Sequence, residues 1–176
     1  MESRVASSVG VQYNIYKNKF QYGLGLTFVQ RGYSFHTTYF VSDTSVNGVK
    51  VVPGLFHTHN DYLSLPLSGS YLVGKRFYGQ FGLSLIPAFL VSTKSGLENE
   101  PMKKRSNANG EPSLFDLGGQ LNLGCGFNIN EKWAVFSRLS IYRSITKVNN
   151  ENYFRGTDFR NVATSLGIGI EYRIKG

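Results

Sequence analysis

The 176-residue sequence lacks the features of several common protein classes. Its single cysteine, Cys125, excludes an internal disulfide and any metal cage built from several thiolates. No run of residues approaches the roughly 20 apolar positions that a membrane-spanning helix requires. Charged residues make up 17% of the chain, whereas an ordinary soluble domain contains about a quarter. The composition therefore excludes a disulfide scaffold and a helical membrane protein, and it is unusual for a soluble domain.

The chain is basic, but its basic residues do not form a nucleic-acid site. The formal net charge is +8, and the densest run is Lys103-Lys104-Arg105, inside a polar segment. No zinc-finger spacing, RNP-like motif or basic helix accompanies this run. We therefore predict no nucleic-acid partner and interpret the run as part of a solvated loop that touches anionic lipid headgroups.

The dominant pattern in the sequence is alternation of apolar and polar residues with a period of two, which predicts β-strands. For example, Leu121 and Leu123 alternate with Asn122 and Gly124. Seven segments show the pattern, each long enough for the 9–11 residues of a tilted membrane strand. These segments are residues 8–16, 20–40, 62–73, 77–93, 114–129, 133–146 and 159–174.

The polar face of these strands is rich in Gly, Ser, Asn and Gln. A sheet surface that faces water would instead carry Lys, Glu and Thr and would avoid Gly. Small polar side chains fit the crowded interior of a narrow barrel. We therefore predict an antiparallel up-and-down transmembrane β-barrel, integral to a bacterial outer membrane, with apolar residues toward lipid. A soluble lipocalin-like lipid-binding barrel would require the two faces to be reversed.

The connections between the segments alternate in length. Short turns are expected at 17–19, 74–76 and 130–132, and long polar links at 42–61, 94–113 and 147–158. Outer-membrane barrels have short periplasmic turns, long outer loops and an even strand count. We therefore expect one domain over 1–176 and eight strands in the full barrel. The first strand would be missing from this chain or supplied elsewhere, and residues 1–7 would be the remnant of an outer loop.

Two further patterns fit this interpretation. The opening Met-Glu-Ser-Arg lacks the apolar segment of a signal peptide, so we interpret the chain as a mature or trimmed fragment. Aromatic residues gather near the strand ends, as interfacial girdles do. Beside the short turns these are Phe20, Tyr22, Tyr71, Phe77 and Trp133, and toward the long links Tyr33, Phe35, Tyr39, Phe115 and Phe159.

The strands resemble those of a known family in their order and in their sequences. Residues 61–67 (DYLSLPL) are similar to a central strand that typically reads Tyr-Leu-Glu-Ile-Pro-Leu, and 82–89 (GLSLIPAF) to the strand that follows it. Residues 26–32 and 161–173 resemble further strands. Over residues 8–175 the chain thus resembles the PorT-like outer-membrane β-barrel family of Bacteroidetes-type bacteria, whose namesake serves type IX secretion. Ser64 departs from the usual Glu, and the opening strand is absent. The resemblance implies fold and location without fixing a role.

Several charged and amide residues alternate with the outward apolar residues and therefore point inward. They predict a polar network in the lumen. Buried charges are tolerated only when they are paired and hydrogen-bonded, so we expect Glu171 to pair with Arg138 or Arg173 and to plug the barrel. Alternatively, these charges lie near strand ends and are solvated. The predicted network comprises Arg31, Gln80, Gln120, Asn122, Arg138, Glu171 and Arg173.

We expect the outer loops to carry the function, which would be binding, adhesion or assembly. The partners would be outer-membrane lipid or lipopolysaccharide, or other membrane or secretion-system proteins. The predicted contact surface comprises Lys94, Glu98, Glu100, Lys103, Lys104 and Arg105. A porin-like channel for small solutes is the main alternative.

Enzymatic and metal chemistry receive little support from the sequence. His57, His59 and Asp61 are alternate residues, which would share one face of a strand and could bind a metal ion there. The same residue types are also common in an ordinary polar loop. Ser34 and His36 share a face, yet no partnered carboxylate for a lipid-modifying triad is evident. We predict no enzyme, no cofactor and no metal.

Overall fold

The computed structural model describes residues 2–3, 7–43, 48–98, 101–104, 113–147 and 160–172, and these form one antiparallel sheet. Its strands are β1 (Glu2–Ser3), β2 (Ser8–Lys17), β3 (Phe20–Asp43), β4 (Gly48–Ser64), β5 (Leu67–Gly74), β6 (Phe77–Leu97), β7 (Lys103–Lys104), β8 (Phe115–Asn128), β9 (Trp133–Ser144) and β10 (Val162–Tyr172). No helix within these residues is long and apolar enough to span a membrane.

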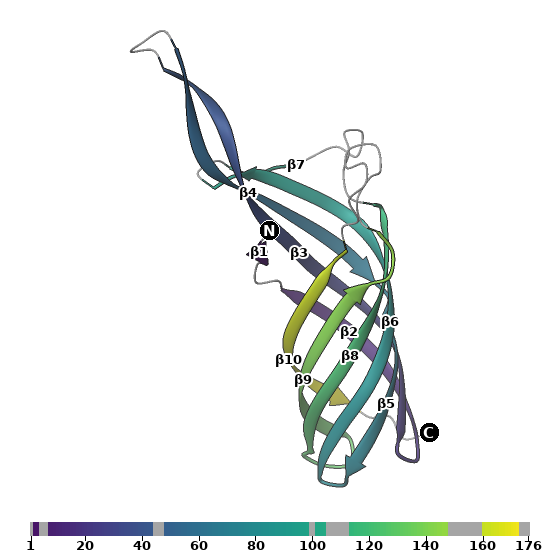
Figure 1. Ribbon diagram of the computed structural model, residues 1–176. Helices are drawn as coiled ribbons and strands as arrows, with labels where there is room; N and C mark the ends of the chain where they lie inside the picture. The colour runs from purple at the N-terminus through teal and green to yellow at the C-terminus, as the bar shows by residue number, and fades with distance from the viewer. Residues whose placement is uncertain are drawn as a thin grey trace.

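The sheet curls into a barrel wall in which neighbours in sequence are neighbours in space (Figure 1). Both β4 and β5 pair with β3 on one side and β6 on the other, so together they make one wall strand. Leu65 and Pro66 interrupt it, but the Pro66 carbonyl still accepts a hydrogen bond from the Gly25 amide at 2.9 Å. Within the described ranges the wall therefore has seven strands, which confirms the seven alternating segments.

The two faces of the wall have the predicted orientation. Leu83 and Leu121 are exposed on the outside, by 62% and 40%, and so is Cys125. Tyr62 and Asn122, on the opposite face, are buried. A sheet with its apolar face exposed and its polar face buried is stable only when lipid surrounds it. The all-β barrel fold is thus confirmed with its polar side inward.

The region expected as a long link at 42–61 is mostly strand, which corrects the sequence prediction. β3 continues to Asp43, and β4 begins at Gly48, with pairs from Asp43–Gly48 down to Thr27–Ser64. The two strands extend as a hairpin well beyond the rest of the barrel (Figure 1). Likewise, β6 continues to Leu97, and it pairs with β7 at Lys94 and Ser95. Alternation fades in these parts because strands beyond the bilayer no longer need an apolar face.

The sheet ends at two edges, formed by β2 and β10. In the described part of the chain β2 pairs with β3 and β10 pairs with β9, and both run toward the short turns. Their outward residues are unusually exposed, as Ile168 (90%) and Val11 (74%) show, because no described strand pairs with them on one side. The expected eighth strand is not among the described residues and stays a prediction. β1, within the expected loop remnant 1–7, pairs with β3.

Aromatic residues ring the short-turn end of the barrel. Close ring pairs, given by centroid distance, are Phe20–Tyr71 (5.3 Å), Phe77–Phe127 (4.7 Å) and Trp133–Tyr172 (4.8 Å). At the other end Phe89 lies 5.4 Å from Phe115.

The outward apolar residues of β3 run from Phe20 to Phe28. Eight residues at about 3.3 Å each and about 40° of tilt span roughly 20 Å along the membrane normal. This height is comparable with the apolar band of a membrane barrel.

Candidate functional site in the barrel lumen

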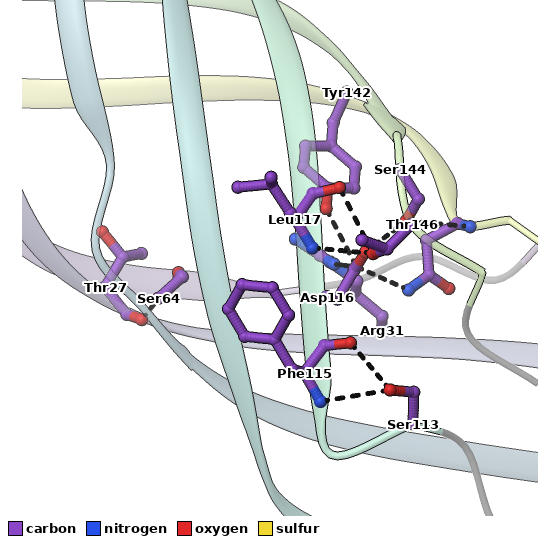
Figure 2. Close-up of polar contacts among 11 residues, drawn as sticks. Thr27, Arg31, Ser64, Ser113, Phe115, Asp116, Leu117, Tyr142, Ser144 and Thr146 are labelled. Atoms are coloured by element: carbon purple, nitrogen blue, oxygen red, sulfur yellow. Dashed lines mark hydrogen bonds and ion pairs between the residues drawn. The ribbon is translucent and has the colours of Figure 1, made fainter.

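A buried carboxylate, Asp116 of β8, organises the lumen near its loop end (Figure 2). Five side chains donate hydrogen bonds to it: Arg31 (2.6 Å), Ser144 (2.6 Å), Tyr142 (2.9 Å), Asn161 (2.9 Å) and Thr146 (3.3 Å). Asp116 itself is fully buried. A carboxylate accepts about four hydrogen bonds, so its capacity is filled.

Arg31 of β3 forms the positive half of this cluster. Its guanidinium carbon lies 4.0 Å from the ring centroid of Tyr142 and 5.0 Å from that of Tyr62. The ion pair with Asp116 is almost completely shielded from solvent. The two rings hold the guanidinium by cation–π attraction while the carboxylate compensates its charge. The cluster therefore ties together β3, β4, β8 and β9 across the bore.

A second cluster lies near the short-turn end, around Glu171 of β10. Its carboxylate accepts hydrogen bonds from Asn14 (3.0 Å), Gln21 (3.3 Å) and the Tyr16 hydroxyl. The Gln21 side chain accepts a bond from Gln80 at 2.7 Å, and Gln80 accepts one from Arg138 at 3.3 Å. This chain of amides connects β10 to β6 and β9 through β2 and β3. Arg138 thus joins the network through Gln80.

Between the two clusters the wall carries a layer of small polar groups. Asn122 donates to Ser84 (2.8 Å) and accepts from Ser140 (2.8 Å) and Gln120 (2.6 Å). A cavity of about 250 Å³ lies at this level, lined in part by Gln120 and Ser140 and by both edge strands, β2 and β10. The lumen therefore has polar walls in the middle and hydrogen-bonded clusters toward both ends.

Aromatic rings and glycines fit against each other on the inner wall. The ring of Tyr142 lies over Gly118, and the ring of Tyr78 lies over Gly126. A methyl group at either glycine would overlap the ring. The glycines that suggested a narrow bore thus make room for inward tyrosines, which fill it.

Comparison with known proteins supports this description of an inverted, lipid-facing barrel. Residues 1–150 match the outer membrane protein beta-barrel domain family. The chain belongs to this family. No curated protein and no solved structure matches the chain. Membership places this outer membrane barrel in the bacterial outer membrane, so the short turns face the periplasm and the long hairpin faces outward. The narrower resemblance to PorT-like proteins stays a prediction.

The structure divides the predicted lumenal network of this outer membrane barrel into separate groups. Arg31 belongs to the outer cluster, Gln120 and Asn122 to the middle layer, and Gln80, Arg138 and Glu171 to the periplasmic cluster. Arg173 lies outside the described residues. The described residues of the predicted network are thus spread over two clusters and a middle layer instead of one network around Glu171, while their role as a plug stays a prediction. Asp116 was missed, although it shares the inward parity of Gly118.

Part of the predicted contact surface lies on strands. Lys94 is part of β6, and Lys103 and Lys104 form β7; all three are exposed, as is Glu98. Glu100 and Arg105 lie outside the described ranges. The loop expected at 94–113 therefore begins with paired strands.

The residues weighed for metal or enzyme chemistry have ordinary partners. His57 shares a hydrogen bond of 2.8 Å with Ser34, and Asp61 accepts one of 3.1 Å from Gln30. His36 is exposed. Across the part of the chain that the structure describes, no three His, Cys, Asp or Glu side chains gather as a metal site would require.

Proposed function

We propose that this outer membrane barrel is a non-enzymatic protein whose lumen is plugged by its own side chains and whose outer surface binds partners. The observation that carries the plug is the presence of hydrogen-bonded clusters toward both ends of the bore. A barrel of this width has an interior that side chains just fill. A solute that crosses the bore would have to displace the Arg31–Asp116 ion pair, which is almost completely shielded from solvent.

Conductance in planar bilayers tests the plug. We expect the reconstituted barrel to be electrically silent. A double variant, Tyr78→Ala with Tyr142→Ala, removes two rings that fill the bore and should show measurable conductance. It serves as the positive control for insertion and orientation. Steady channels in the unmodified protein would instead favour the small-solute channel.

The hairpin of β3 and β4 supports binding by the outer surface. Its pairs from His36–Leu55 to Asp43–Gly48 lie beyond the part of β4 that pairs with β6. A two-stranded hairpin is marginally stable alone in water, so a partner surface would stabilise it. Membrane or secretion-system proteins are partners of the size that such an extended hairpin can reach.

Site-specific photocrosslinking in cells tests the hairpin. Val51, 55% exposed on the hairpin, is one position, and Val73, 60% exposed at the periplasmic end, is the matched control. We expect a protein adduct at Val51 that is absent at Val73. Identical crosslinking patterns at the two positions would rule out the hairpin as the contact element.

A further inference from the structure

Three basic side chains form one row across the outer wall. The register pairs His59 of β4 with Lys94 of β6, and Lys94 with Lys104 of β7. Directly opposite residues in antiparallel strands lie on the same face. On β6 the neighbours of Lys94, Thr93 and Ser95, are buried, whereas Lys94 is exposed. The row therefore faces outward, on the same side as the lipid-facing residues lower on the wall.

Lys94 and Lys104 bring two positive charges close together in this row. Cβ atoms of opposite residues are about 5 Å apart, so the two lysines destabilise each other unless an anion lies between them. No described carboxylate forms an ion pair with Lys94 or Lys104. The nearest acidic residue on this face of β4, Asp61, is buried and accepts a hydrogen bond from Gln30. The geometry thus leaves room for an external anion.

The height of the row above the apolar band identifies where that anion would lie. Val91, 59% exposed, is the last outward apolar residue of β6, and Lys94 follows three residues later. The register with β4 shifts by one residue at Val91, so Lys94 lies about two ladder positions above it and on the same face. At about 3.3 Å per position and about 40° of tilt, this is roughly 5 Å along the membrane normal. The headgroup layer on each side of the hydrocarbon core is about 5–8 Å thick. Lysine stems can bend toward the lipid, so both ammonium groups reach headgroup level.

We propose that Lys94 and Lys104, with His59 at the inner end of the row, bind the phosphate of an anionic lipid in the outer leaflet. His59 is positioned for this because its ring packs beside Gly32, which has no side chain to displace it. A lipid phosphate is held at this height by the bilayer itself, whereas a free phosphate or an acidic protein is not. The proposal goes beyond a general binding role for the outer surface and does not depend on a closed lumen.

The chain supplies its own control for the test. Lys103 is adjacent to Lys104, is equally basic and exposed, and pairs with Ser95, so it lies on the opposite face. The full chain would be reconstituted in phosphatidylcholine nanodiscs with and without bisphosphorylated lipid A. Lipid A retained per barrel would then be measured by native mass spectrometry. The variants are Lys94→Gln, Lys104→Gln and Lys103→Gln, with Lys104→Arg as the charge-preserving variant.

We expect Lys94→Gln and Lys104→Gln each to weaken lipid A binding about fivefold, from about 1 kcal/mol per lysine near an anionic surface. Lys103→Gln and Lys104→Arg should stay within about twofold of the unmodified protein. Equal losses for Lys103→Gln and Lys104→Gln would overturn the site. So would unmodified protein that retains lipid A no better than phosphatidylcholine, or whose bound lipid A is displaced by an equal concentration of inorganic phosphate.

Discussion

Replacing Asp116 by asparagine tests whether the outer cluster holds the barrel together. The change preserves the shape of the side chain but removes its charge, while Arg31 stays buried between two tyrosine rings. Breaking a buried pair by removing one partner costs about 3–5 kcal/mol, because the remaining charge is uncompensated. We therefore expect the free energy of unfolding to fall by that amount.

A double-mutant cycle isolates the ion pair from the other contacts of Asp116. Arg31→Met removes the guanidinium, and the Arg31→Met, Asp116→Asn protein contains neither charge. Since contacting residues are coupled, the double variant should be more stable than the sum of the single changes predicts, by about 2 kcal/mol. Asp61→Asn is the matched control, because Asp61 is similarly buried but its hydrogen bond is to an amide, Gln30.

The measurement uses the single tryptophan, Trp133, which lies against Tyr172 at the periplasmic end. Its fluorescence would follow urea unfolding of the barrel in lipid vesicles. Ser144→Ala, which removes one of the five donors, gives a milder step of about 1.5–3 kcal/mol if Asp116→Asn does not fold. Strictly additive single effects, or a loss for Asp116→Asn no larger than for Asp61→Asn, would refute the ion pair as the element that stabilises the lumen.

Other predictions concern the remaining features of the barrel. Gly118→Ala should lower the free energy of unfolding by about 1–3 kcal/mol because the new methyl group meets the Tyr142 ring. Gly119→Ala, whose methyl group meets open space, should leave the free energy of unfolding nearly unchanged, and urea unfolding compares the two variants. Leu121→Arg places a charge on the lipid face and should cost about 2–4 kcal/mol in vesicles, while similar stability in both variant and parent would contradict the outward assignment. Incubation with lipid A should leave its mass unchanged, and a defined mass shift would establish an enzyme.

The sequence predicted the wall correctly because lipid imposes a regular requirement on it. Every strand inside the bilayer needs apolar residues on one side, so Leu121, Leu123 and most of their equivalents alternate with polar residues over the membrane thickness. Beyond the bilayer this requirement ends, and the extension of β3 and β4 around His36 and Val51 lost its alternating signal. Strand boundaries outside the membrane therefore could not be derived from alternation alone.

The alternation in the sequence predicts which residues face the lumen, but it does not predict which of them contact each other. Inward residues such as Arg31 and Glu171 follow from the alternation, and Asp116 has the same parity as Gly118 and could have been found. Which of them pair depends on how the strands are staggered around the barrel. Arg31 and Asp116 lie on β3 and β8, which are not neighbours in the sheet. Their contact across the bore depends on closure and tilt, which a linear pattern does not encode.

Among the described residues, the two edge strands of the wall, β2 and β10, run in the same direction. This limits what could close the gap between them, which we call the seam. A second molecule inserted the same way into the membrane would offer the same two descending edges, so any ladder between two molecules would be parallel. Only a segment that ascends from the periplasm could form antiparallel ladders with both borders at once. Lateral self-association through the seam is therefore disfavoured by geometry, whatever the surrounding lipid.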